Sequence, residues 1–129
     1  MAEQGASGEF HVQQRRSTRL LQAVPLTVGG HDAGGRPLQE QTATLTINCH
    51  GCRYFSRFQV EKNAWLTLEI PGSAASQESH RLRARVAWVH KSRRLRGLFQ
   101  VGVEFEVPGN VWGIASPPED WRRFATQDG

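Results

Sequence analysis

Short segments in which apolar and polar residues alternate recur along the middle of the chain. In an extended chain such alternation buries one face and exposes the other, so each segment predicts a strand. The predicted strands are 24–28, 39–48, 52–58, 65–70, 81–90 and 98–107. Strands at this short, even spacing favour a small antiparallel barrel or sandwich, and the sequence therefore predicts an all-β fold.

The predicted strand 39–48 has two distinct faces. Its apolar side is expected to point into the core and consists of Ala43, Leu45 and Ile47. Its polar side is expected to point outward and consists of Thr42, Thr44, Thr46 and Asn48. A tight turn at 49–51 would lead into the next strand.

Helix is expected only near the end of the chain. Ser116 and Glu119 form a capping box with Pro117 at the first helical position, which predicts a short helix over Pro117–Phe124. The tryptophans are expected to serve the core and a C-terminal cover, because their large rings bury much area. They are Trp65, Trp88, Trp112 and Trp121.

The chain is expected to form one domain with short tails. Residues 1–9 hold little that could be buried and are predicted to be disordered. Residues 10–23 would form an arginine-bearing segment, and 24–124 a domain with its C-terminal cover. Residues 125–129 complete the chain as a second tail.

The charge of the chain points to anionic partners. Sixteen Lys and Arg residues oppose twelve Asp and Glu residues, and most of the basic residues are arginines. Arginine binds phosphate as a planar, bidentate fork, so this bias favours phosphate-bearing ligands. The run 90–96 is the most basic stretch and is interpreted as an exposed hairpin tip. Contact of this run with nucleic acid, an acidic protein or a membrane surface is the alternative.

Several functional classes are not expected. Residues 1–9 lack a signal peptide, and no apolar run approaches the ~18 residues of a membrane span, so we expect a cytoplasmic protein. The five histidines show no nucleophile or metal spacing, and neither an enzyme nor a cofactor is expected. Cys49 and Cys52 could form a redox pair or half a zinc site, but two small residues flanking a turn are the favoured interpretation.

An arginine cluster precedes the first predicted strand. Arg15 and Arg19 are four residues apart, so they share one face in either a strand or a helix, and Arg16 lies beside them. Two guanidinium forks on one face could grip a phosphorylated ligand. Taken alone, the stretch is more typical of a solvated basic segment near the N-terminus, and that is the favoured interpretation until the later strands are considered.

The cluster and two later segments together resemble the PilZ domain family. After Arg-x-x-x-Arg come Ala-Arg-Val-Ala-Trp-Val at 84–89 and Val-Gly-Val-Glu-Phe at 101–105. The resemblance covers about residues 15–107 and implies a six-stranded antiparallel PilZ-like β-barrel, here with a short C-terminal helix. Many members of the family are cytoplasmic receptors for the bacterial second messenger cyclic di-GMP.

The second motif of the family, [Asp/Asn]-x-Ser-x-x-Gly, is altered in this sequence. Aligning its glycine to Gly51 places Thr46 at the first position and Asn48 at the serine position. The other alignment starts at Asn48 but puts His50 and Arg53 at the serine and glycine positions. The first alignment keeps glycine at the turn, where backbone freedom is expected to be needed. The carboxylate of the motif is lost, and this change is expected to affect ligand affinity more than the fold.

The resemblance implies a cyclic di-GMP receptor that signals by reordering its arginine segment over the barrel and so changes how it meets a downstream protein. The implied ligand-binding residues are Arg15, Arg16, Arg19, Thr46, Asn48 and Gly51. One alternative is a PilZ-like protein-interaction module that does not bind nucleotide. A second is a small basic barrel for single-stranded nucleic acid, which the composition favours less; it would use Arg93, Arg94 and Arg96.

Overall fold

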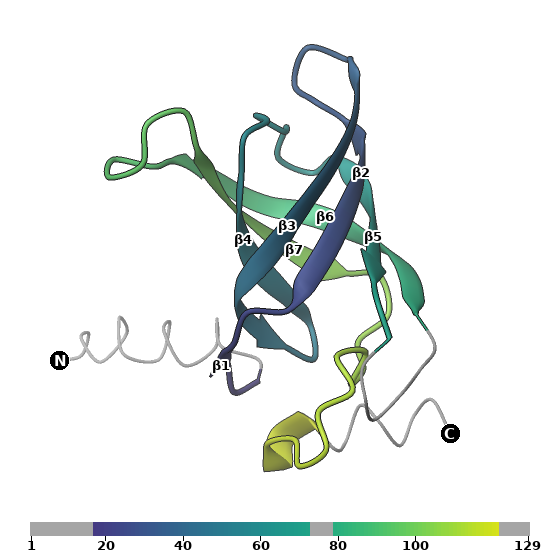
Figure 1. The fold of residues 1–129 in the computed structure, drawn as a ribbon. Helices are drawn as coiled ribbons and strands as arrows, with labels where there is room; N and C mark the ends of the chain where they lie inside the picture. Colours follow the sequence, from purple (N-terminus) through teal and green to yellow (C-terminus); the bar gives the residue numbers. More distant parts are fainter. Residues whose placement is uncertain (1–16, 73–78, 122–129) are drawn as a thin grey trace, which may run out of the picture.

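A computed structural model of the protein describes residues 17–72 and 79–121. Nearly all regular structure in these residues is β-sheet (Figure 1). The strands are β1 (Leu20–Leu21), β2 (Pro25–His31), β3 (Pro37–Asn48), β4 (Gly51–Ser56), β5 (Trp65–Ile70), β6 (His80–Lys91) and β7 (Phe99–Phe105). One 3₁₀ helix, η1, spans Glu119–Trp121.

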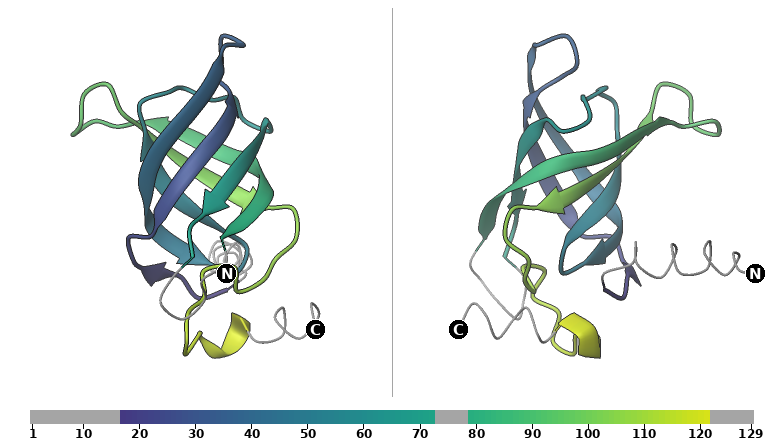
Figure 2. Two further views of the ribbon diagram at one scale, coloured as in Figure 1. Left: turned by 45° about the vertical axis from the view of Figure 1, so that its right-hand side comes forward. Right: turned by 180° about the vertical axis from the view of Figure 1, so that it is seen from behind.

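The six strands β2 to β7 close into an antiparallel barrel (Figures 1 and 2). The sheet order is β1-β3-β2-β5-β6-β7-β4, and an additional pairing of β3 with β4 closes the ring. The short β1 lies outside this ring and pairs with the end of β3, Leu20 opposite Ile47. The predicted all-β, six-stranded barrel is therefore confirmed, with β1 as an extra outer strand.

The core fills the barrel with the apolar faces that the alternation predicted. Strand β5 is representative, since Leu66, Leu68 and Ile70 are buried. Trp65, on the opposite face of the strand, is 45% exposed. Each fully buried aliphatic side chain of this kind contributes about 1.5–3 kcal/mol relative to an exposed one. Trp112 and Trp121 join the same core cluster from the C-terminal segment, so two of the four tryptophans serve the core and cover as expected.

The predicted faces of β3 are partly wrong. Ala43 is exposed and Leu45 only half-buried, whereas Thr44 is buried. The cause is an irregularity in the pairing with β4 between Thr44 and Thr46, which reverses the inward-facing parity so that Ile47 points into the core. Thr44 is tolerated inside because its hydroxyl donates to the Gln22 carbonyl at 2.6 Å and accepts from the Val24 N–H at 2.9 Å.

Glu40 is a buried carboxylate on the inward side of β3. It accepts hydrogen bonds from the Ser56 hydroxyl at 2.5 Å and from the Arg57 N–H at 2.9 Å. The ion pair with the Arg57 guanidinium is longer, 3.7 Å, and Arg57 is 71% exposed, so the two hydrogen bonds matter more. Glu40 therefore fixes the end of β4 to β3.

Glu40→Ala is expected to lower the free energy of unfolding by about 2 kcal/mol. The Arg57 N–H loses its acceptor, and the buried Ser56 hydroxyl keeps only the weaker bond to the Phe58 carbonyl at 3.1 Å. Urea denaturation measures the change. The matched control is Glu69→Ala, since Glu69 is an exposed carboxylate on β5 and its loss should change stability by less than about 0.5 kcal/mol. Equal effects of the two substitutions would contradict the role assigned to Glu40.

The C-terminal part of the chain is less helical than predicted within the described residues. Only η1 forms in the predicted helix Pro117–Phe124, and residues 122–124 lie outside the described residues. The predicted tails, 1–9 and 125–129, also lie outside them. Within residues 17–72 and 79–121, no helix has the length and apolar character of a membrane span.

Candidate functional site

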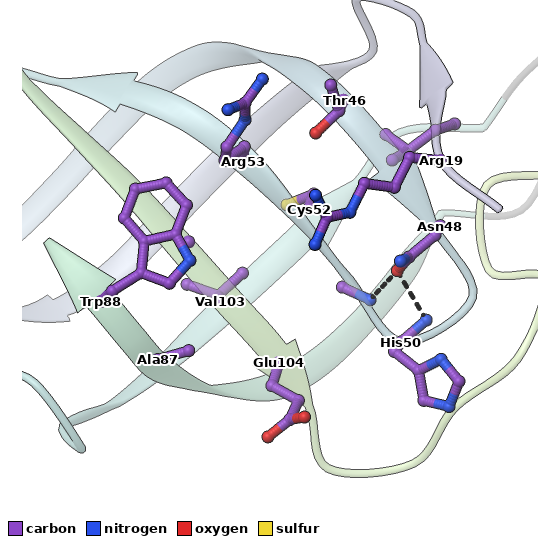
Figure 3. A pocket seen from close by; sticks show the side chains of 13 residues that line it. Arg19, Thr46, Asn48, His50, Cys52, Arg53, Ala87, Trp88, Val103 and Glu104 are labelled. Atoms are coloured by element: carbon purple, nitrogen blue, oxygen red, sulfur yellow. Dashed lines mark hydrogen bonds between the residues drawn. The ribbon is translucent and has the colours of Figure 1, made fainter. Parts of the chain in front are cut away.

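A pocket of about 370 Å³ lies on the outer face of the barrel, where β3, β4, β7 and β6 run side by side. Figure 3 shows its lining side chains, among them Arg19, which reaches over the strands from just before β1. The full lining is Arg19, Thr46, Ile47, Asn48, His50, Gly51, Cys52, Arg53, Ala87, Trp88, Gly102, Val103 and Glu104. Cations, an aromatic ring and amide groups thus share one surface.

The β3–β4 turn forms one rim of the pocket. The Asn48 side-chain oxygen accepts hydrogen bonds from the N–H groups of His50 at 2.9 Å and Gly51 at 2.8 Å (Figure 3). This closes the turn in the way that asparagine side chains commonly do. The amide nitrogen of the same side chain is a donor that the turn does not use in these two bonds.

Gly51 is required for close approach, and not for the backbone freedom that the sequence suggested. It is absent from the glycines with positive φ among the described residues. A Cβ placed on Gly51 would lie 1.9 Å from the Val103 carbonyl oxygen on β7. Glycine at this position therefore lets β4 and β7 pair at the base of the pocket.

Trp88 provides the aromatic wall. It pairs with Gly102 across the β6–β7 ladder, and a Cβ on Gly102 would lie 2.3–2.6 Å from atoms of the Trp88 indole. The ring is thus laid over a glycine, half-buried, with the His90 ring 5.0 Å away between centroids. This position differs from the expected role in the core, and it presents an aromatic surface to the pocket.

The charged groups of the pocket differ in how they are paired. The Arg53 Nε is buried and has no hydrogen-bond partner within the part of the chain that the structure describes. Arg19 is exposed beside the pocket. Glu104 accepts a hydrogen bond from Arg85 at 2.8 Å, and Arg85 also donates to Asn63 at 2.7 Å. The lining therefore combines two guanidinium groups with one carboxylate that is held by an arginine.

The outward arginine row of β6 is largely engaged with neighbouring side chains. Arg83 lies over the Trp65 ring, 4.3 Å from its centroid, and 3.5 Å from the Glu106 carboxylate. Arg85 pairs with Glu104 as described above. Arg83 and Arg85 are therefore each paired with a glutamate on the barrel surface, which offsets their positive charge.

The backbone before Arg19 is attached to the barrel. Ser17 is buried and its hydroxyl lies 3.2 Å from the His50 Nδ1. Thr18 bonds to Asp120 and Trp121 near the other end of the chain. Arg19 thus projects from an anchored segment, although its own side chain is exposed.

The two cysteines are thiols beside the β3–β4 turn, and the Cys49 Sγ lies 3.6 Å from the His50 Nδ1. Both are buried and free of a disulfide bond. Burial raises the pKa of each thiol above its usual value, so both are protonated at neutral pH and are weak nucleophiles. Among residues 17–72 and 79–121, no group of three His, Cys, Asp or Glu side chains is placed to hold a metal ion.

The structure brings four of the six predicted site residues to this pocket. They are Arg19, Thr46, Asn48 and Gly51. Arg15 and Arg16 lie outside the described residues. The sequence interpretation did not assign Arg53, Trp88 or Glu104 to the site. Glu104 lies on the face that was predicted to point outward, whereas Trp88 was expected on the inner face, and a register shift between Val86 and Trp88 separates it from that face. Only the strand register shows that the three residues meet.

No protein-family model matches the sequence, and no curated protein matches it. Solved structures do resemble the fold. The Bacillus subtilis inhibitor of motility MotI/DgrA aligns over 89% of this chain and 49% of its own, with a TM-score of 0.59 and 11% identity. The PilZ domain of CeSA from a cellulose-synthesising bacterium aligns over 86% of this chain and 97% of its own, with a TM-score of 0.50 and 13% identity.

A third resemblance is to K. pneumonia MrkH in its complex with c-di-GMP. It covers 88% of this chain and 50% of MrkH, with a TM-score of 0.50 and 13% identity. This chain thus spans about half the length of MotI/DgrA and of MrkH. At such low identity the alignments establish the fold alone. The chain has a PilZ-like fold, the fold that its sequence pattern predicted.

Proposed function

We propose that the protein is a cyclic di-GMP-binding receptor or adaptor module, and that the pocket beside β3 and β4 is its ligand site. The observation that carries the proposal is the convergence of Arg19 with Thr46, Asn48 and Gly51 on one pocket of a PilZ-like barrel. Arg19 belongs to the first family motif, and Thr46, Asn48 and Gly51 occupy the positions of the altered second motif. Arg19 is 27 or more residues from the other three in sequence. Their meeting on one pocket supports a common ligand.

The lining suits a ligand that carries phosphates and purines. Arg19 and Arg53 offer guanidinium forks for phosphate oxygens, and the buried Nε of Arg53 is a donor still to be satisfied. The Trp88 ring offers a face on which a purine can stack, an interaction worth about 1–3 kcal/mol per base. Arg15 and Arg16 are proposed to add to the phosphate contacts.

The altered second motif changes how the turn side of the pocket would bind. Thr46 is only 8% exposed, and the Asn48 oxygen already closes the turn. We therefore assign ligand contact at this rim to the Asn48 amide nitrogen. Glu104 brings a carboxylate to the lining, where it could accept from a guanine edge in place of the carboxylate that the motif has lost.

The proposed signal passes from the ligand to an unidentified downstream protein in the bacterial cytoplasm. The reordering expected from the sequence concerns a segment of which residues 10–16 lie outside the described residues. Residues from Ser17 onward already contact the barrel and η1. We therefore restrict the proposed reordering to the part of the arginine segment before Ser17.

One alternative keeps support from a specific observation. Because Thr46 is nearly buried and the Asn48 oxygen is engaged, the turn offers fewer polar groups than the family motif would. A PilZ-like barrel with this turn could serve protein interaction without nucleotide. The same titration separates the two functions.

The deciding experiment is a calorimetric titration with cyclic di-GMP, with GTP and a short single-stranded oligonucleotide as controls. Saturable binding of cyclic di-GMP alone would support the receptor function. Folded protein that gives no heat with cyclic di-GMP would overturn it in favour of the interaction module. Oligonucleotide binding that weakens steeply with salt would instead favour the single-stranded nucleic-acid barrel.

A further inference from the structure

Residues 109–121, here called the C-terminal strap, lie at the end of the barrel that carries β1 and the β3–β4 turn (Figures 1 and 2). The strap contains η1 and two tryptophans, Trp112 and Trp121, which are 5% and 0% exposed. Burial of these rings explains why the strap stays on the barrel. Its hydrogen bonds show that it also holds two segments that line the pocket.

The strap uses all the polar groups of Thr18, the residue just before Arg19. The Asp120 Oδ2 accepts from the Thr18 N–H at 2.8 Å and from the Thr18 hydroxyl at 3.0 Å. The Trp121 indole N–H donates to the Thr18 carbonyl at 2.7 Å. These three bonds fix the backbone from which the Arg19 side chain projects over the pocket.

The strap also holds the β3–β4 turn, which forms a rim of the pocket. The Trp112 indole N–H donates to the Asn48 carbonyl at 2.8 Å, and the Gly109 N–H donates to the Cys49 carbonyl at 2.9 Å. Both sequence motifs assigned to the pocket are thus attached to one segment. The strap itself contributes no residue to the pocket lining.

Covering the barrel end does not require the carboxylate of Asp120. Its Oδ1 is buried with no hydrogen-bond partner among the described residues, which is a cost that an apolar side chain would avoid. Within the described residues, the two hydrogen bonds from Thr18 to the Asp120 Oδ2 offset this unfavourable burial. The placement of Asp120 is therefore explained by the segment it holds.

We infer that Asp120 and Trp121 are positioning residues for Arg19, and that docking of the strap and occupancy of the pocket stabilise each other. The second half of this inference rests on the proposed function. Coupling between two sites is reciprocal in free energy, so a ligand that binds the placed arginine must also tighten the strap. By the same relation, a downstream protein that detaches the strap from the barrel would lower the affinity of the pocket for its ligand.

The test compares Asp120→Ala with two matched variants. Asp120→Asn keeps one acceptor oxygen for Thr18, and Glu119→Ala removes an exposed neighbouring carboxylate of η1. In the ligand-free protein, amide hydrogen exchange of Thr18 and Arg19 should become faster in Asp120→Ala only. The amides of β5 and β6 should exchange as in the wild type, which shows that the barrel is folded.

The ligand half is tested by titration with cyclic di-GMP. Asp120→Ala should weaken binding about tenfold, within the usual range of coupling between sites, and Asp120→Asn should recover most of that loss. Cyclic di-GMP should in turn slow exchange of the Thr18 amide in the wild type. Unchanged exchange in Asp120→Ala, or faster exchange with wild-type affinity, would overturn the inference. If the wild type does not bind, the proposed function fails, and exchange alone decides whether the strap positions Arg19.

Discussion

Gly51→Ala should lower the free energy of unfolding by roughly 3 kcal/mol and the Tm by roughly 10 °C. The new methyl group would lie 1.9 Å from the carbonyl oxygen of Val103 and 2.9 Å from its carbonyl carbon. Both atoms belong to the backbone, so no side-chain rotation can relieve the contact. β4 would have to separate from β7 along a ladder that runs from Gly51 to Ser56.

The matched control for this prediction is Gly29→Ala on β2. Gly29 also lies in a paired strand, and a Cβ there would meet nothing within 4 Å. Its substitution should leave stability unchanged or raise it slightly, because alanine restricts the unfolded chain. Thermal and urea denaturation of both variants make the comparison. A Gly51→Ala protein as stable as the Gly29→Ala protein would show that close approach to Val103 is unnecessary.

Arg19→Ala should weaken cyclic di-GMP binding by roughly 100-fold while leaving the fold intact. A hydrogen bond to a charged group contributes about 1.5–3 kcal/mol, and Arg19 is placed to make such bonds at the pocket entrance. Stability should change little, since the side chain is exposed. Calorimetric titration gives the affinity, and circular dichroism checks the fold.

Arg36→Ala is the matched control for Arg19. It removes the same charge from the loop between β2 and β3, at the other end of the barrel (Figure 1). If binding depended only on the net positive charge of the protein, Arg19→Ala and Arg36→Ala would weaken cyclic di-GMP binding equally. Wild-type binding by Arg19→Ala would remove the residue from the site and contradict the assignment.

The strands could be predicted because their alternation records burial on one face. β5 and β7 follow that rule closely, with Leu66, Leu68, Val101 and Val103 inside. β3 departs from it because one pairing irregularity near Leu45 changes which residues point inward. Alternation in a single sequence cannot locate such an irregularity. Nor does it show that the buried hydroxyl of Thr44 finds its backbone partners 20 and 22 residues earlier in the chain, between β1 and β2.

The site residues that belong to a family motif could be predicted from the sequence. Those that only the strand register brings together could not. Arg19 and Asn48 were assigned from family motifs. Arg53 and Trp88 meet because both pair with Gly102, one from β4 and one from β6. No local pattern contains that three-strand relation. The same holds for Asp120, because its contact joins η1 to Thr18, a loop residue 102 positions earlier, and no periodic signal links the two.

The hydrogen bonds between Thr18 and the strap span 102 or 103 residues of sequence. A ribosome therefore makes Arg19 long before it makes the groups that hold it. Contacts that close such long loops form late, because the chain must lose much entropy before they are made. The barrel strands can pair first. Arg19 is held in place only after residue 121 has been synthesised and has left the ribosome. In a growing or truncated chain, a folded barrel would exist without a finished pocket.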